Sequence, residues 1–284
     1  MTVMPIRPAR PSSLAAELRK LAAFVRRDFL VAWSYRMSFL TQFLSLFSAV
    51  ILFYFVGRMV DPSKIPSVSG TQVSYLEFAV VGMALGGFVH FGLERVSNAM
   101  RAEQMMGTLE SLLATPTASS TLQVGSVLFD LMFIPLRLGI LLTVMSLVFG
   151  LGLEPSGIPQ VIALLFAFLP FIWGLGVAAA AITMTYRRGA GIVGFAALGL
   201  TMVSNVYFPI ALLPGWMQGA ATASPIAVAV DGTRDALLGN AGWGDLAPTL
   251  LLLAPMSIAS LAFGVIAFRF ALRRERRLGT LGAY

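Results

Sequence analysis

Charged side chains at regular spacing stand out in this chain because most of the sequence is apolar. The stretch MRAEQMMGTLESLLATP, from Met100 to Pro116, carries one arginine and two glutamates. Glu103 and Glu110 are seven residues apart and share one face of a helix. A different face carries an apolar stripe: Ala102, Met105, Met106, Leu109, Leu112 and Leu113. The pattern predicts a short amphipathic helix that either meets a partner through its carboxylates or only caps a bundle.

Other ionisable residues lie inside or at the edges of apolar runs, where a charge is costly and usually has a purpose. Asp130 and Arg137 share a helical face, and Pro135 between them would kink that helix. They form either a gate or substrate contact, or a structural pair near the inner interface. His90 either packs on its helix or lines the path. A single histidine and no cysteine predict no metal site and no catalytic site.

Composition indicates that these residues belong to an integral membrane protein. Hydrophobic residues make up 57% of the chain and charged residues 12%, with a mean hydropathy of +0.83. Soluble domains carry roughly 25% charged residues. The net charge of +7 could suggest nucleic acid, but the arginines flank apolar runs and form no basic face on a soluble fold. The expected surroundings are therefore a lipid membrane, and no nucleic acid is expected.

Apolar runs predict an all-α fold with six transmembrane helices, since a crossing needs about 20 apolar residues. The uncharged run from Gly189 to Val230 is too long for one crossing. If it crossed twice, however, the arginines of FRFALRRERR would fall outside, against the preference of Lys and Arg for the cytoplasm. We therefore expect one crossing followed by short helices that re-enter the outer leaflet. The expected spans are about 37–57, 75–95, 119–151, 157–186, 189–213 and 247–269.

This topology predicts three regions, with both termini in the cytoplasm. Residues 1–36 form a cytoplasmic N-terminus, residues 37–270 the transmembrane domain and residues 271–284 a basic cytoplasmic tail. No secretory signal peptide is expected, since the first apolar run starts only at Met37 behind a long basic segment. Small residues at four-residue spacing predict close helix contacts, within the chain or across a dimer: Gly82 with Gly86, and Gly174 with Ala178.

The N-terminal region contains an amphipathic pattern of its own. Basic residues occupy one helical face, and apolar residues recur on another at spacings of three or four: Leu14, Leu18, Leu21, Val25 and Phe29. We expect this helix to lie on the cytoplasmic membrane interface. The alternative is a solvated basic leader.

Two motifs resemble the membrane subunits of ABC-2 type ABC transporters. The first is E-x-x-x-G-T-L-E followed by LLATP, and it comprises Glu103, Gly107, Thr108, Leu109 and Glu110. The second, between Tyr207 and Gly239, is an F-P-x-x-x-L-P-x-W segment followed by a proline, an acid and an arginine: Phe208, Pro209, Leu213, Pro214, Trp216, Pro225, Asp231 and Arg234. The motifs stand in the order of that family, and the resemblance covers nearly the whole chain.

The resemblance implies a permease of the drug or antibiotic exporter type in the cell membrane, driven by ATP hydrolysis in a separate subunit. The first motif would press into that ATPase as a coupling helix, and the second would form the re-entrant outer segment. The implied partners are two copies of an ABC ATPase and a second permease, in a homodimer or a heterodimer. The only lysines, Lys20 and Lys64, lie in no Walker A loop, so ATP and Mg belong to the partner and this chain binds no cofactor.

The cargo is less closely defined by the sequence. The absence of an obvious aromatic belt disfavours a sugar polymer and favours a hydrophobic small molecule or a lipid. The alternatives are a polysaccharide or glycolipid exporter and an ion-coupled secondary transporter. Secondary transporters are expected to show internal repeats, and this chain shows none.

Overall fold

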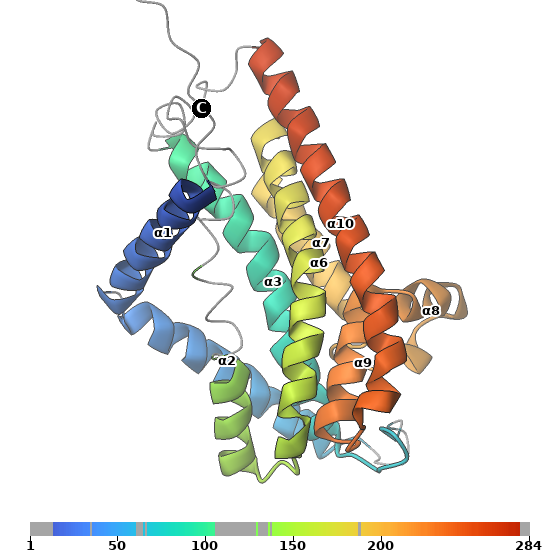
Figure 1. The fold of residues 1–284 in the computed structure, drawn as a ribbon. Helices are drawn as coiled ribbons and strands as arrows, with labels where there is room; N and C mark the ends of the chain where they lie inside the picture. Colours follow the sequence, from blue (N-terminus) through green and yellow to red (C-terminus); the bar gives the residue numbers. More distant parts are fainter. Residues whose placement is uncertain are drawn as a thin grey trace, which may run out of the picture.

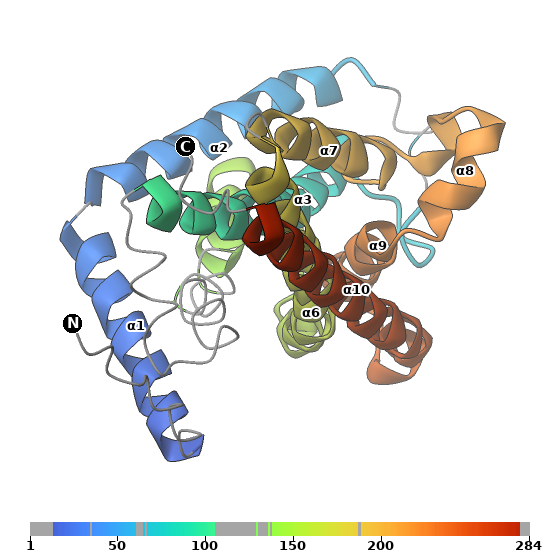
Figure 2. The same cartoon turned by 90° about the horizontal axis from the view of Figure 1, so that it is seen from above.

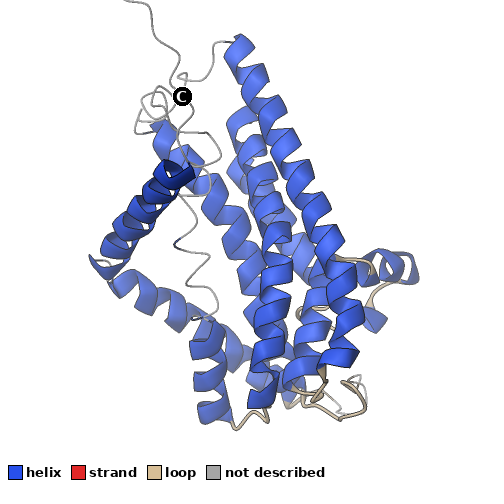
Figure 3. Cartoon of the chain, viewed as in Figure 1, coloured by secondary structure: helices blue, strands red, loops and turns tan. Residues whose placement is uncertain are grey.

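The computed structural model describes residues 14–34, 36–60, 65, 67–105, 129, 136, 138–186 and 189–278. These residues form helices joined by loops, and a single bridge pairs Val68 with Thr71 (Figure 3). The described helices are α1 (Leu14–Ser34), α2 (Arg36–Gly57), α3 (Tyr75–Met105), an apolar helix over Leu138–Phe149, η2 (Pro155–Gly157), α6 (Ile158–Thr185), α7 (Gly189–Val203), η3 (Ile210–Leu212), α8 (Gly215–Thr222), α9 (Pro225–Leu237) and α10 (Trp243–Leu278). The described part of the chain is thus all-helical, as the sequence predicts.

Helices α3, α6, α7 and α10 run side by side in a bundle (Figures 1 and 2). Helix α9 packs among them at one end, α1 and α2 lie along one flank, and α8 projects from the side. The core lies where α3, α6 and α9 meet, and large apolar side chains are fully buried there: Phe78, Leu85, Leu164, Phe168, Ile172 and Ile226. Helix α6 therefore forms the centre of the bundle.

The lengths and hydropathy of the helices can be compared with what a membrane crossing requires. Within the described residues, two helical segments are long and apolar enough to cross a membrane, by length and composition: Pro155–Thr185 and Trp243–Arg274. Shorter apolar helices fall in the other four expected spans: Phe47–Gly57, Tyr75–His90, Leu138–Phe149 and Gly191–Val203. Helices α2 and α6 begin and end within one residue of the spans expected at 37–57 and 157–186.

The fifth expected span, 189–213, extends too far, because α7 ends at Val203. Asn205 follows in the left-handed conformation, with φ of 59°, and Pro209 is extended. A left-handed residue ends a helix, since its carbonyl no longer points along the helix axis. A helix of 15 residues rises only about 22 Å, less than the roughly 30 Å of a hydrocarbon core. The chain therefore leaves its helix earlier than an uncharged run suggests.

Two helices continue further than the expected spans. Helix α3 runs without a break to Met105, so Met100–Met105 belong to it and do not begin a separate coupling helix. Helix α10 continues to Leu278, so the expected tail at 271–284 starts as part of the last helix. The sequence has no glycine or proline from Leu93 to Met105 or from Val265 to Leu278. Polar residues alone do not end a helix, because most of them are good helix formers.

Candidate functional site

Arg234 on α9 is a fully buried charged side chain, only 2% exposed. Its Nε and Nη2 donate to the carbonyl oxygen of Phe78 on α3, at 3.2 and 2.9 Å. Nη2 also donates to the carbonyl oxygen of Val206 at 3.3 Å. Nη1 forms an ion pair with the Asp231 carboxylate at 3.3 Å. One side chain thus ties α9 both to α3 and to the segment that follows α7.

The free-energy cost of burying this guanidinium is offset by contacts with polar groups and with an aromatic ring. Removing a charge from water costs several kcal/mol, which is offset only when the donors find partners. The guanidinium carbon also lies 3.5 Å from the centroid of the Phe78 ring, and a desolvated cation–π contact contributes about 2 kcal/mol. The side chain of Asp231 remains 48% exposed, so its carboxylate balances the charge without full desolvation. Arg234 therefore acts as a structural anchor.

Residues 206–223, which join α7 to α9, are called the anchored segment below. Asn205 forms the turn between α7 and this segment. Asparagine adopts the left-handed conformation more readily than most residues. Its side-chain amide nitrogen donates to the Asp231 carboxylate, and beside it the hydroxyls of Ser204 and Ser224 lie 3.0 Å apart. The start of the connecting segment is thereby held against the start of α9. Residues 206–223 form a closed loop from which α8 projects (Figure 1).

Glycines on α3 let this segment approach the helix closely. A Cβ added to Gly82 would overlap the carbonyl oxygen of Val206 and crowd the guanidinium of Arg234. A Cβ added to Gly86 would overlap the Val206 side chain. The expected small-residue pair on this helix is therefore used for packing within the chain. It creates the space in which the Arg234 anchor sits.

Aromatic contacts connect the same segment to α2. The Tyr75 hydroxyl donates to the carbonyl oxygen of Tyr207 at 3.2 Å. Phe53 of α2 stacks on the Tyr207 ring, with centroids 5.6 Å apart. The turn after α7 thus contacts α2 and α3 together.

The last turn of α9, which carries Arg234, makes further contacts. The Asp235 carboxylate accepts from the Ser69 hydroxyl at 2.8 Å, and the Glu154 backbone nitrogen donates to the Leu237 carbonyl oxygen at 2.8 Å. A Cβ added to Gly157 would overlap the backbone of Ala236. Together with the bonds of Arg234, these contacts fix the last turn of α9 against α3, Ser69 and the start of α6.

The motif residues between α7 and α9 divide into a buried and an exposed set. Pro209 is buried, and Leu213 and Pro225 are half-buried. Phe208, Leu212 and Trp216 are exposed, and the Trp216 side chain is 82% exposed. Pro214, at the start of α8, is exposed as well. The segment thus presents an apolar, aromatic face away from its anchor.

Two other predicted site residues, Glu103 and His90, are described and lie on α3 outside this cluster. Glu103 lies in the last turn of α3, and His90 lies on the exposed side of the same helix. Gly107, Thr108, Leu109 and Glu110 lie outside the described residues, as do Asp130 and Arg137. Among the predicted site residues that the structure describes, those it brings together belong to the second motif.

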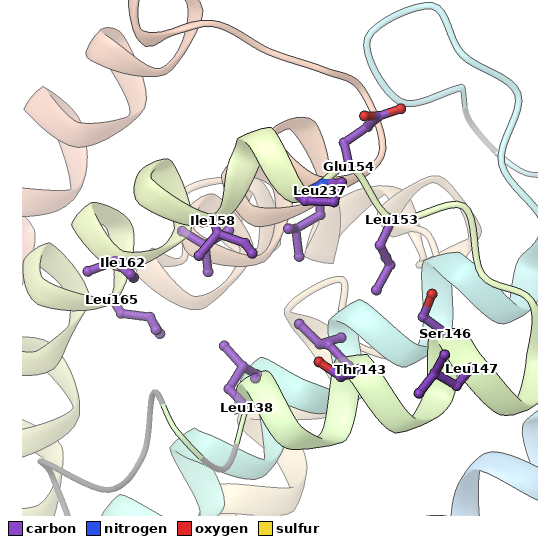
Figure 4. A pocket seen from close by; sticks show the side chains of 14 residues that line it. Leu138, Thr143, Ser146, Leu147, Leu153, Glu154, Ile158, Ile162, Leu165 and Leu237 are labelled. Atoms are coloured by element: carbon purple, nitrogen blue, oxygen red, sulfur yellow. The ribbon is translucent and has the colours of Figure 1, made fainter.

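An apolar cavity of about 330 Å³ lies between the helix Leu138–Phe149 and the start of α6 (Figure 4). Aliphatic side chains from both helices project into it, including Leu138 and Leu165. Thr143 and Ser146 contribute the hydroxyls of its lining, and the carboxylate of Glu154 points away from it. The cavity is large enough for part of an apolar ligand, since ligand pockets hold about 300–1,000 Å³.

Sequence reasoning found Asp231, Arg234 and the Gly82–Gly86 pair but missed three of their partners. Phe78 and Val206 contribute backbone carbonyls, which no sequence pattern marks. Asn205 did carry a signal, because it is the one asparagine in the uncharged run from Gly189 to Val230, shortly before Pro209. Such a residue in an apolar run indicates a turn that requires a polar partner.

The anchored segment and its supporting helices lie within a range matched by a known family. The ABC-2 type transporter model matches residues 19–238, which include α2, α3 and all of α9. No curated relative matches the chain. The match spans well over half of the 284 residues and includes the Arg234 anchor. The chain therefore belongs to the ABC-2 type transporter family and is a membrane permease subunit, not an enzyme.

Proposed function

We propose that this permease exports a hydrophobic small molecule, such as a drug or an antibiotic, or a lipid, across the cell membrane. The observation that supports an apolar cargo is the cavity of about 330 Å³ with its aliphatic walls. Burial of apolar surface in such a cavity stabilises an apolar ligand by roughly 25 cal/mol per Å². A polysaccharide would instead require many hydrogen-bonding groups along its path.

The energy for transport comes from two copies of a separate ABC ATPase, which use ATP and Mg. A second permease, either another copy of this chain or a related one, completes the membrane unit. Two considerations support this assembly. The six crossings expected from the sequence are few for enclosing a path, and two ATPase subunits that close symmetrically require two permeases related by the same symmetry.

The chain is oriented with both termini in the cytoplasm. The last turns of α3, α6 and α10 lie at the same end of the bundle (Figure 1), and α10 carries several arginines there. Such a concentration of arginine favours the cytoplasmic side. The anchored segment lies toward the other end and is the re-entrant outer structure. Arg234 of α9, which binds this segment, is buried, so this arginine adds no exposed positive charge to the outer surface.

The coupling function belongs to the first motif, which begins in the last turn of α3. Glu103, Gly107, Thr108, Leu109 and Glu110 contact the ATPase in this proposal and pass its closure to the membrane. Helix α3 is suited to transmit such a movement because it carries Glu103 in its last turn and the carbonyl of Phe78 in its first. A continuous helix thus joins the coupling end to the Arg234 anchor. Asp130, Arg137 and His90 are candidates for the path or its gate.

Removing the two motif carboxylates tests this function. The double variant Glu103→Gln/Glu110→Gln, reconstituted with the partner ATPase, is expected to lower ATP-driven transport of a hydrophobic cargo at least about tenfold. Its thermal unfolding is expected to stay close to that of the wild type, because exposed charge pairs contribute only about 0–1 kcal/mol. The measurements are transport into proteoliposomes across a panel of drugs, lipids and oligosaccharides, together with ATP hydrolysis.

Asp245→Asn is the matched control, since it removes one carboxylate at the opposite end of the bundle. Asp245 accepts from the backbone nitrogen of Gly242 at 3.0 Å, and asparagine can accept the same bond. This control is expected to transport at the wild-type rate. Wild-type transport and ATPase binding by the double glutamine variant would refute the coupling role. Transport of oligosaccharides alone would refute the apolar cargo.

A further inference from the structure

Helix α10 has a buried face and an exposed face along most of its length. Leu253, Phe268 and Ala271 are buried, and the last two pack in a cluster with α6. On the other side, Phe263 and Ile266 are 65% and 66% exposed. In a membrane protein such an outward apolar stripe contacts lipid acyl chains. Contact of this stripe with lipid requires only that the chain lies in a membrane.

The apolar stripe continues without a break into a basic one. Phe270, Arg273, Arg274 and Arg277 recur at spacings of three, four and seven residues, so they share one helical face. All four are exposed, and together they line a hollow of about 410 Å³. The Phe270 side chain is 73% exposed and follows Phe263 and Ile266 on the same stripe. Acyl-chain contacts and positive charge therefore adjoin within one turn of helix.

The length of α10 places this junction at the membrane surface. Trp243 begins the helix and is 54% exposed, as expected for an aromatic residue at the membrane interface. From Trp243 to Phe270 the helix rises about 40 Å. A bilayer with its headgroup regions is about 40–45 Å thick. Arg273 and Arg274 therefore reach the phosphate level of the opposite leaflet.

We propose that Phe270, Arg273, Arg274 and Arg277 form a binding site for an anionic phospholipid. The guanidinium groups bind its phosphate, because their planar donors match phosphate oxygens in a bidentate arrangement. One acyl chain lies along Phe263, Ile266 and Phe270. The alternative occupant is an acidic protein surface. The lipid fits better because the exposed apolar stripe enters the same hollow, where a soluble acidic surface would leave Phe270 uncovered.

Lipid retention by the purified full chain tests this site. Native mass spectrometry in detergent would compare phosphatidylglycerol with phosphatidylcholine of the same acyl chains. The wild type is expected to retain phosphatidylglycerol preferentially. The triple variant Arg273→Gln/Arg274→Gln/Arg277→Gln is expected to lose one bound phosphatidylglycerol. Its affinity for this lipid is expected to fall roughly tenfold or more, since each arginine near an anionic surface adds to the attraction for anionic lipid.

The matched control is the triple lysine variant Arg273→Lys/Arg274→Lys/Arg277→Lys. It keeps the charge and is expected to bind phosphatidylglycerol more tightly than the glutamine variant does. Equal retention of phosphatidylglycerol by the wild type and the glutamine variant would overturn the proposal. So would unchanged lipid binding with loss of the co-purified ATPase, since that result assigns the arginines to a protein interface.

Discussion

Replacing Arg234 by alanine is expected to be the most destabilising single substitution in the described part of this chain. The carbonyl oxygens of Phe78 and Val206 would each lose a donor in a buried site, and the Asp231 carboxylate would lose its counter-charge. Removing a hydrogen-bond partner from a buried polar group costs about 1–3 kcal/mol per group, and the desolvated cation–π contact with Phe78 would be lost as well. The measurement is thermal unfolding of the purified protein in detergent, together with the yield of folded protein.

Arg58 is the matched control for this prediction. Its guanidinium also meets an aromatic ring, since it lies 5.1 Å from the centroid of Tyr54 and donates to the Tyr54 hydroxyl at 2.8 Å. Arg58 is exposed, so Arg58→Ala is expected to cost only about 0–1 kcal/mol. Arg234→Lys should fall between the two, because it keeps the charge but not the planar set of donors. Equal unfolding midpoints for Arg234→Ala and Arg58→Ala would contradict the anchor.

A methyl group at Gly264 is expected to push α6 and α10 apart. A Cβ there would overlap the carbonyl oxygen of Gly174, and one at Gly174 would overlap the backbone of Ser260. The obstructing atoms are backbone atoms that no rotamer change can move, so α6 and α10 must move apart. We expect Gly264→Ala to lower the free energy of unfolding by about 1–3 kcal/mol, the usual cost of overpacking.

Gly244 lies on the same helix and provides a control of opposite sign. A Cβ added there meets no atom within 4 Å. Alanine is preferred over glycine in a helix by about 1 kcal/mol, so Gly244→Ala is expected to be neutral or stabilising. The measurement is again thermal unfolding in detergent. If the two variants shift the unfolding midpoint equally, the close contact between α6 and α10 is not what holds them together.

Sequence patterns correctly predicted the position of helices that are apolar on most sides. They misplaced the ends of helices where polar side chains determine where the helix stops. Helix α6 lies almost exactly where its apolar run predicts it, because a charge-free run of that length has one favourable conformation in a membrane. Helix α7 ends early because Asn205 binds Asp231, a contact between residues far apart in the sequence. Helix α3 continues beyond its apolar run because helix-forming polar residues follow it.

The candidate site shows the same division. The motif residues Asp231 and Arg234 were visible in the sequence as a pair one helical turn apart. Their role was not visible, since an arginine next to an apparent loop reads as an exposed charge. Only the packing of α9 against α3 shows that the guanidinium is buried and bound to backbone carbonyls. Carbonyl acceptors are common to every residue, so their position follows from the fold alone.

The proposed function depends on the orientation of the chain, because the coupling motif must face the ATPase while the anchored segment lies on the outer side. Cysteine labelling in intact cells tests it most directly, since the chain has no cysteine of its own. Gly215 and Gly219 are exposed and have open space around an added Cβ, so Gly215→Cys and Gly219→Cys should fold normally. The reference is Thr280→Cys, in the expected cytoplasmic tail.

We predict that an impermeant maleimide labels the cysteines at positions 215 and 219 in intact cells, and labels the cysteine at position 280 only after the membrane is permeabilised. Labelling of position 280 from outside, with positions 215 and 219 reached only after permeabilisation, would contradict the orientation and with it the coupling role of the first motif.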